Sequence, residues 1–464
     1  MKTSHDFIIL GSGSTAFAAA RKASMLGARV LMVEQSQLGG TCVNWGCIPS
    51  KTLIHKAKEY YAAVRSAPFG VNLRAEELDY ALLMQAKRKA VEDVRREHYQ
   101  QVLDADPAID VLRGHGRFLS PRELQVGAEV LVSDRFLIAT GGVPRSLRLP
   151  GLVEAGYLNS YSALNLPGFP ESLLIIGGGV IAVELGQMFA RFGTRVTIVE
   201  RSERLLKDFD GRLSDIFSDI LRQEGVELIY NFEATEVRRE EDRVCLHGRC
   251  GETEADRCLR AERILLAVGT APASRGIGLE EAGVACDENG FICVDEEMRT
   301  SAPGIWAAGD VAGPPLIAPS GAREGEVAAE NMLNPAAHRR IDHRLTPMAV
   351  FVDPELATVG LSPAQARAAG KEVVDTFFTL DHVAKAHVMG GKRGGFVLCA
   401  EKGSGRVLGA QILAPRAADI IHEAALAVRF GLSVHDLAET IHVYPTIADG
   451  LRLAALENIA AQRN

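Results

Sequence analysis

The feature that most constrains the fold is a strand, a glycine-rich turn, a helix and an acid-terminated strand that occur twice in the chain. The first copy is DFIILGSGSTAFAAARKASMLGARVLMVE, residues 6–34, and the second is SLLIIGGGVIAVELGQMFARFGTRVTIVE, residues 172–200. A glycine turn between strand and helix lets the backbone approach a pyrophosphate at the helix N-terminus. The repeat therefore predicts two dinucleotide-binding units in one chain.

Both copies place the same residue types at corresponding positions. The carboxylate that ends each second strand can accept the hydroxyls of a ribose, and it follows the first glycine by the same number of residues in each copy. The predicted dinucleotide-binding residues are Gly11, Gly13, Ala16 and Glu34 in the first copy, and Gly177, Gly179, Ala182 and Glu200 in the second. We expect an α/β fold with two Rossmann-like dinucleotide-binding domains.

Length and composition limit the class of protein. A chain of 464 residues is too long for one core and is expected to form roughly three domains of about 150 residues each. Its net charge of −8 lacks the basic excess typical of nucleic-acid binding, and no run of about 18 apolar residues predicts a membrane span. Eight cysteines are too sparse for a disulfide scaffold. We expect a cytoplasmic protein that binds small molecules, with neither a nucleic-acid nor a membrane partner.

The segment GGTCVNWGCIPSK, residues 39–51, contains two cysteines five positions apart. In an ideal helix their Cα atoms would be ~8.6 Å apart, which exceeds the roughly 4.4 to 6.8 Å of a disulfide. The chain must therefore bend between Cys42 and Cys47, and Asn44 and Gly46 tolerate such a bend. Pro49 suits the first turn of a helix that resumes near Cys47. A redox pair is favoured, and a metal clip or an inert staple is the alternative, although zinc usually needs four ligands.

The cysteine pair also predicts which cofactor each unit binds. Only the first unit is followed closely by the cysteines, and a flavin can exchange electrons with a disulfide, so we expect FAD there and NADH or NADPH at the second unit. Electrons would pass from NAD(P)H to FAD and then to sulfur. Glu200 favours NADH because its carboxylate repels a 2′-phosphate, whereas Arg201 or Arg204 is a potential partner for that phosphate.

Several motifs together resemble the pyridine nucleotide-disulfide oxidoreductases, the flavoenzymes that include dihydrolipoamide dehydrogenase, glutathione reductase and mercuric reductase. They are the cysteine segment, LIATGGVPR at 137–145, ILLAVGTAP at 264–272, TSAPGIWAAGD at 300–310 and VFVDPELATVGLS at 350–362. The resemblance implies that Cys42 is the outer thiol that meets substrate and Cys47 the inner thiol that contacts the flavin. It also implies that Lys51 and Glu184 form an ion pair beside the two cofactor rings.

The same resemblance extends the set of cofactor-binding residues and implies a domain plan. Asp310 is expected to bind the ribityl chain of FAD, and the further cofactor-binding residues are Gly40, Thr41, Gly116, Thr140, Gly141 and Gly269. The expected domains are an FAD domain at 1–150 and 271–340, an NAD(P) domain at 151–270, and a C-terminal α+β dimerisation domain at 341–464. A homodimer with its active site across the interface is implied.

The stretch HVYPTIADG near the C-terminus bears on the substrate. In the lipoamide and glutathione enzymes of this family, a histidine stands directly before Pro-Thr and pairs with a glutamate as acid and base. This sequence has Tyr444 there, and Asp449 in place of the glutamate. Tyrosine, with a pKa of about 10, is a poor base at neutral pH, whereas histidine near 6.5 is suited to a dithiol. His442 is the alternative base, and strand-like alternation would place it on the same face as Tyr444.

Tyr444, together with Tyr157 in GYLNSYSAL, resembles the pair of active-site tyrosines of mercuric reductases. The resemblance implies reduction of Hg(II) or another soft, thiol-reactive electrophile, with Hg(II) held transiently by Cys42 and Cys47 because soft thiolates favour soft metal ions. No cysteine follows Cys399, whereas mercuric reductases end in a cysteine pair, so slower mercury delivery is expected. The alternatives are a dihydrolipoamide dehydrogenase-like enzyme, a reductase of a small disulfide or hypothiocyanous acid, and a flavin-binding assembly subunit.

A second cysteine pair occurs in CLHGRC, Cys245 to Cys250, with His247 between the two and Cys258 beyond. The segment is predicted to lie in a β-hairpin before ILLAVG, where cysteines are usually small apolar fillers. A metal-binding role is the alternative.

Overall fold

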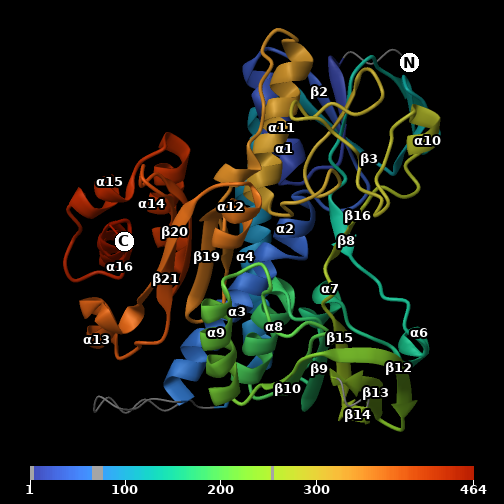
Figure 1. The fold of residues 1–464 in the computed structure, drawn as a ribbon. Coiled ribbons are helices and arrows are strands. Elements are labelled where there is room, and N and C mark those ends of the chain that lie inside the picture. Colours follow the sequence, from blue (N-terminus) through green and yellow to red (C-terminus); the bar gives the residue numbers. More distant parts are fainter. Residues whose placement is uncertain (1–4, 65–76, 252–254, 464) are drawn as a thin grey trace.

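The structure is a computed structural model that describes residues 5–64, 77–251 and 255–463. Figure 1 shows three parts: a first unit in which blue N-terminal elements lie beside the later helix α11, a green second unit, and an orange to red C-terminal part at the side. Each part is built around its own sheet.

Five parallel strands form the first sheet, in the order β17-β7-β1-β2-β3. They are β1 (Phe7–Leu10), β2 (Val30–Glu34), β3 (Ile109–Arg113), β7 (Phe136–Ile138) and β17 (Ile305–Ala307). Phe7, Ile8 and Ile9 have no exposed surface, as expected for parallel strands covered on both faces. Helices α1 (Ser14–Met25) and α11 (Ala318–Leu333) pack against each other beside this sheet (Figure 1).

Four parallel strands form the second sheet, in the order β11-β10-β9-β15. They are β9 (Ser172–Ile176), β10 (Arg195–Val199), β11 (Glu227–Ile229) and β15 (Arg263–Leu266). Helix α8 (Val180–Arg191) follows β9, as α1 follows β1. The two sequence repeats therefore form matching βαβ units, as predicted.

Each unit also contains a three-stranded antiparallel sheet, and a further antiparallel pair of strands connects the two units. The first unit carries β4 (Gly116–Ser120), β5 (Glu123–Val126) and β6 (Glu129–Val132), and the second carries β12 (Phe232–Glu240), β13 (Arg243–Cys250) and β14 (Ala255–Ala261). Between the units, β8 (Gly142–Pro144) pairs with β16 (Thr270–Pro272). The chain thus leaves the first unit after β8 and returns along β16.

The C-terminal part is an antiparallel sheet covered by helices. Its strand order is β18-β19-β22-β21-β20, with β18 (Met348–Val350), β19 (Glu355–Gly360), β20 (Val373–Thr379), β21 (Gly395–Glu401) and β22 (Val407–Ala414). Helices α14 (Ala417–Phe430) and α16 (Asp449–Ala461) lie against it. The predicted fold class, α/β with an α+β C-terminal part, is confirmed, while the predicted domain boundaries stay predictions.

The remaining helical segments connect these elements. They are α2 (Gly40–Asn44), α3 (Cys47–Val64), α4 (Tyr80–Arg95), the π-helix η1 (Arg96–Gln100), α5 (Gln101–Ala105), α6 (Leu152–Ala155), α7 (Ser160–Ala163), α9 (Gly211–Gln223), α10 (Leu279–Ala282), the 3-10 turns η3 (His343–Leu345) and η4 (Leu380–His382), α12 (Pro363–Ala368), α13 (Ala384–Met389) and α15 (Val434–Glu439). Among the described residues, none of the helices has the length and apolar character needed to cross a membrane.

Candidate active site

The cysteine segment bends between its two thiols, as the spacing predicted. Helix α2 ends at Asn44 and α3 begins at Cys47, so the helical path is interrupted at Trp45 and Gly46. The Asn44 side chain fixes the last turn of α2 by donating hydrogen bonds to the carbonyl oxygens of Leu38, at 2.8 Å, and Gly40, at 2.9 Å. Cys42 therefore lies in one helix and Cys47 in the first turn of the next.

Cys42 and Cys47 are both thiols in the structure and interact directly. The Cys42 thiol donates a hydrogen bond to the Cys47 sulfur, and this hydrogen bond together with the nearby Lys51 cation lowers the pKa of Cys47 to about 7. The same hydrogen bond and burial raise the pKa of Cys42 well above its ordinary value. Cys47 is thus the thiolate of the pair and Cys42 the proton-bearing partner, which is the electronic asymmetry expected of an inner and an outer thiol.

One turn after Cys47, Lys51 connects the first unit to the other two parts. Its Nζ lies 2.7 Å from Oε2 of Glu184 on α8, and 5.0 Å from the centre of the Phe351 ring. The other carboxylate oxygen of Glu184 accepts a hydrogen bond of 2.8 Å from the backbone N–H of Phe351. The sequence analysis named Lys51 and Glu184 but missed Phe351, although that residue lies in VFVDPELATVGLS, a motif singled out without a role.

The first glycine turn is closely packed against neighbouring backbone. A Cβ on Gly11, where φ is +113°, would lie 2.3 Å from the carbonyl oxygen of Ala139, and one on Gly40 would lie 2.7 Å from the Cα of Gly13. Gly13 precedes α1 without a side-chain cap, so the first N–H groups of this helix have no side-chain partner. Only glycines allow this approach of the cysteine segment to the turn.

Polar groups around this turn match the needs of a bound dinucleotide. The hydroxyl of Thr140 is buried and, among the described residues, has no hydrogen-bond partner. Glu34 accepts hydrogen bonds of 2.6 Å from the hydroxyl of Ser12 and from the backbone N–H of Ser36. Asp310 follows β17, where burial and the charge of Glu324 raise its pKa to about 6. These groups line the carboxyl ends of the strands, where ligands bind in such sheets.

The other predicted cofactor-binding residues lie in the same region or at the corresponding point of the second unit. The Thr41 hydroxyl lies 3.4 Å from the carbonyl oxygen of Gly142. Gly141 and Gly269 have positive φ, and both have open space where a side chain would stand. Gly116 begins β4, and a Cβ on it would lie 3.4 to 3.6 Å from the surrounding apolar side chains.

The second glycine turn repeats the first, with one difference. A Cβ on Gly177 would lie 2.5 Å from the carbonyl oxygen of Ala267, and Gly179 precedes α8 without a side-chain cap, but nothing described lies within 4 Å of a Cβ on Gly179. The carboxylate of Glu200 lies against this turn, because a Cβ on Gly178 would meet it at 2.9 Å. Ala182 is fully buried, as is Ala16 in the first unit.

The two arginines after Glu200 differ in their surroundings. Arg204 donates a hydrogen bond of 2.7 Å to Glu203, and its guanidinium lies against Gly211. Arg201 is exposed and lines a hollow with Asn231, Glu233 and Gly251. Arg201 is therefore the more exposed of the two, and Arg204 is the one with an acidic partner.

Tyr157 packs against the apolar cluster of the second unit, which includes Leu174 and Ile176. Four residues later, Tyr161 lies much closer to the cysteine segment: its hydroxyl is 3.4 Å from that of Thr41, and its ring is 6.3 Å from the ring of Trp45. Burial raises the pKa of Tyr161. Sequence reasoning missed Tyr161, and the only signal was its place in the same GYLNSYSAL segment.

The C-terminal residues differ from the strand-like expectation. Residues 441–446 are irregular, so the predicted alternation is wrong, and the ring of His442 is held by Glu423 at 2.9 Å and by the carbonyl oxygen of Thr440 at 2.8 Å. Tyr444 is 72% exposed in the single chain. Asp449 begins α16 and lies 2.7 Å from Arg452. The imidazole of His442 is thus held by hydrogen bonds, whereas the phenol of Tyr444 is exposed.

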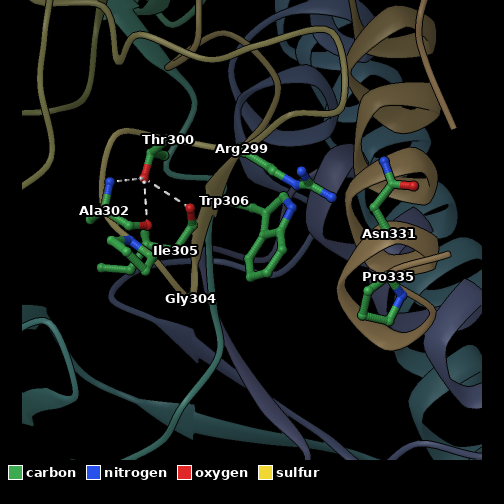
Figure 2. A pocket seen from close by; sticks show the side chains of 9 residues that line it. Arg299, Thr300, Ala302, Gly304, Ile305, Trp306, Asn331 and Pro335 are labelled. Atoms are coloured by element: carbon green, nitrogen blue, oxygen red, sulfur yellow. Dashed lines mark hydrogen bonds between the residues drawn. The ribbon is translucent and has the colours of Figure 1, made fainter. Parts of the chain in front are cut away.

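A cavity of about 270 Å³ lies elsewhere in the first unit (Figure 2). Arg299, Thr300 and Trp306 line it at the amino end of β17, and α11 contributes Asn331. Asp310 follows the opposite end of the same strand. This cavity is therefore separate from the carboxyl-end site.

Two dinucleotide-type turns beside a coupled thiol pair define the class of redox enzymes that pass electrons between nucleotide cofactors and sulfur. Family models agree: the pyridine nucleotide-disulphide oxidoreductase model matches residues 5–331, and the dimerisation domain of that family matches residues 346–455. The chain belongs to the pyridine nucleotide-disulphide oxidoreductase family, whose members are FAD-binding oxidoreductases that use NAD(P)H. The dimerisation domain indicates a homodimer.

Similar proteins have more than one named activity. Mercuric reductase from Bacillus cereus is 38% identical over 97% of this chain and 71% of its own length, and dihydrolipoyl dehydrogenase from Thermus scotoductus is 36% identical over 98% and 97%. Among solved structures, the Cu(II) complex of the HOCl-induced flavoprotein disulfide reductase RclA from Escherichia coli has a TM-score of 0.87 at 29% identity, covering 98% of this chain and 99% of that one. The chain is thus a flavoprotein disulfide oxidoreductase.

Proposed function

We propose that this enzyme uses NAD(P)H to reduce Hg(II) or another soft, thiol-reactive electrophile. The observation that carries the proposal is the thiol pair itself, in which the pKa of Cys47 is lowered to about 7 beside Lys51. It is combined with an exposed tyrosine in place of the histidine base of the lipoamide and glutathione enzymes. The named mercuric reductases among its relatives support the proposal.

The residues of the first unit fit FAD. The uncapped start of α1 and the glycine cradle suit a pyrophosphate, the unpartnered hydroxyl of Thr140 offers a hydrogen bond, and Glu34 and Asp310 would bind ribose and ribityl hydroxyls. When bound, FAD supplies the electrons that it receives from NAD(P)H. The Lys51 cation beside Cys47 would stabilise negative charge that develops next to this thiolate.

The thiols are arranged to capture a soft cation. About half of the Cys47 side chains are ionised near pH 7, and Cys42 carries the proton that a thiophilic metal ion displaces on binding. From this ionised form, a two-coordinate bis-thiolate complex forms by loss of a single proton. Sulfur is the preferred donor for such ions, so the pair favours Hg(II) over hard cations.

Tyr444 is the residue that separates this proposal from lipoamide oxidation. A dithiol substrate must give up a proton to a base near neutral pH, and a phenol with a pKa of about 10 is poorly matched to that task. His442 does not fill the gap, because Glu423 and Thr440 engage both of its ring nitrogens. Hg(II) needs no such base, since it arrives as a Lewis acid.

The second unit favours NADH. Glu200 is held by the backbone N–H of Ser202 at 2.9 Å and faces the glycine turn, where its carboxylate would bind the ribose hydroxyls and repel a 2′-phosphate. Arg204 is paired with Glu203, so of these two arginines the exposed Arg201 is the better placed to bind such a phosphate.

A second candidate is a reductase of another oxidising electrophile, favoured by the likeness to the HOCl-induced reductase RclA over nearly the whole chain. Such a reaction needs the same cysteines and no imidazole. Cu(II) and hypothiocyanous acid are therefore test acceptors alongside Hg(II).

The test measures NADH consumption by the flavin-loaded enzyme with Hg(II) as its thiol complex, and in parallel the oxidation of dihydrolipoamide. We expect mercury-dependent turnover and feeble lipoamide activity. Tyr444→His should raise the rate of dihydrolipoamide oxidation, by up to the roughly 10²- to 10⁴-fold that a positioned general acid-base group contributes. Tyr444→Phe should not raise this rate. Robust dihydrolipoamide oxidation by the parent enzyme, abolished in His442→Gln, would overturn the proposal in favour of a dihydrolipoamide dehydrogenase.

A further inference from the structure

Two sulfurs and an imidazole meet on the small antiparallel sheet of the second unit. The ligand atoms of Cys245, His247 and Cys258 all lie within 4.8 Å of one another. The strand register produces this meeting: His247 is directly opposite Cys258 in the β13–β14 ladder, and Cys245 stands two residues before His247 on the same face. Residues on alternate positions of β13, Val244 and Leu246, pack into the apolar cluster instead.

The cluster is sheltered but open to small ions. Cys245 is fully buried, whereas His247 and Cys258 are half-buried. The Nε2 atom of His247 lies 3.3 Å from the Sγ of Cys245, so the ring nitrogen is aimed at the sulfur. In the structure Cys245 and Cys258 form a disulfide, with Cα atoms 5.8 Å apart.

We propose that Cys245, His247 and Cys258 form a redox-controlled binding site for a thiophilic d¹⁰ cation. In the disulfide state the sulfurs cannot act as thiolate ligands. A thiol or phosphine reductant delivers two electrons and the sulfurs take up two protons, which gives two thiols. A divalent cation then binds as the bis-thiolate, releases those two protons, and takes the His247 imidazole as its third ligand.

The donor set and its surroundings select the class of ion. Two sulfurs and one imidazole nitrogen are typical ligands of soft or borderline d¹⁰ cations, and no oxygen ligand is in the group. Glu236 is directly opposite His247 on the other neighbouring strand, β12. Its carboxylate is held by Arg238 at 2.7 Å and is not part of the ligand group.

The site is distinct from the candidate active site. Strands β13 and β14 lie at the outer end of the second unit, far from α2 and the start of α3, which carry Cys42 and Cys47 (Figure 1). A direct transfer of metal between the two cysteine pairs of one chain is therefore not part of the proposal. The proposal also does not depend on the substrate proposed above.

The test uses Cd(II) and the flavin-loaded Cys42→Ser/Cys47→Ser protein, which lacks the active-site thiols. Equilibrium dialysis compares oxidised protein with protein reduced by a water-soluble phosphine. The phosphine becomes the phosphine oxide by taking oxygen from water, and it is removed under anaerobic conditions before Cd(II) is added. We expect reduction to expose two further thiols and to add one tightly bound Cd(II) per chain, with a thiolate-to-cadmium ultraviolet band.

Single substitutions in this protein assign the ligands. Cys245→Ser and Cys258→Ser should each weaken the added site by roughly 100-fold or more, and His247→Gln by roughly tenfold. Cys250→Ser is the matched control, because Cys250 lies on the same strand but contacts the carbonyl oxygen of Tyr230; it should retain the site, as should Cys286→Ser/Cys293→Ser. Equal Cd(II) uptake by the Cys42→Ser/Cys47→Ser protein before and after reduction would overturn the proposal, a result that needs no further substitution. Full retention of the added site in Cys258→Ser would also overturn it.

Discussion

The two glycine turns have the same backbone conformation, but they differ in the neighbouring segments that pack on them. In the first unit the cysteine segment packs on the turn. Gly40 is so close to Gly13 that a Cβ on Gly40 would clash with the Cα of Gly13. In the second unit nothing described lies within 4 Å of the equivalent position on Gly179. A covered turn suits a cofactor that stays bound, and an open turn suits one that exchanges in each cycle. The same motif can therefore serve a resident and a diffusing nucleotide.

The largest expected effect comes from blocking the covered turn. Gly11→Val places a branched side chain at φ +113° against the carbonyl oxygen of Ala139, and we expect flavin content per chain to fall by roughly 100-fold given this overlap and strain. Absorbance of the purified protein gives the flavin content, and circular dichroism checks that the chain is folded. A folded Gly11→Val protein with full flavin would break the assignment of FAD to the first unit.

The matched substitution in the open turn should have a different result. Gly177→Val creates the corresponding overlap with Ala267, so we expect flavin content to stay unchanged while KM for NADH rises by roughly 10- to 100-fold. Steady-state kinetics on flavin-loaded protein provide the measurement. Loss of flavin without a change in KM would reverse the two assignments.

A smaller effect should appear in the thiol titration beside the covered turn. The pKa of Cys47 is lowered to about 7, first by the hydrogen bond from Cys42 and also by Lys51. The thiolate should therefore be present above pH 7 and lost as pH falls through that value. Lys51→Met removes the cation and should move the midpoint upward by about one pH unit.

The long-wavelength thiolate-to-flavin absorbance of the reduced enzyme reports this titration. Lys58→Met is a control, because Lys58 on the same helix pairs with Asp353 and should leave the midpoint unchanged. A downward shift in Lys51→Met would contradict the assigned role of the cation.

The smallest expected effect concerns cofactor choice at the open turn. Glu200→Gln removes the charge that repels a 2′-phosphate, so the ratio of kcat/KM for NADH to that for NADPH should fall about fivefold. Arg201→Gln should move the same ratio in the opposite direction. A strong NADPH preference in the parent enzyme would contradict the Glu200 argument.

Local sequence patterns predicted the parts of the site that depend on local geometry. The repeated glycine turns and the break between Cys42 and Cys47 follow from residue types a few positions apart, and the structure contains both. The resemblance to a family added the pairing of Lys51 with Glu184, which spacing alone could not give because the partners lie in different units.

Contacts between distant segments were beyond the sequence patterns. The backbone of Phe351 holds Glu184, and Tyr161 rather than Tyr157 reaches Thr41. Glu423 fixes His442, which no periodicity of the C-terminal segment could indicate. Each of these contacts depends on how the sheets pack together, and a single unaligned sequence contains no direct record of that packing.

The late return of the chain to the first sheet has a consequence for biosynthesis. Strand β17, at residues 305–307, pairs with β7 at residues 136–138, so the ribosome must deliver more than half of the protein before the first sheet closes. The strands of the second sheet are all contained within residues 172–266, and contiguous segments of that kind can fold as they emerge. The nascent chain should therefore complete its second nucleotide unit before its first, in the reverse of their order in the gene.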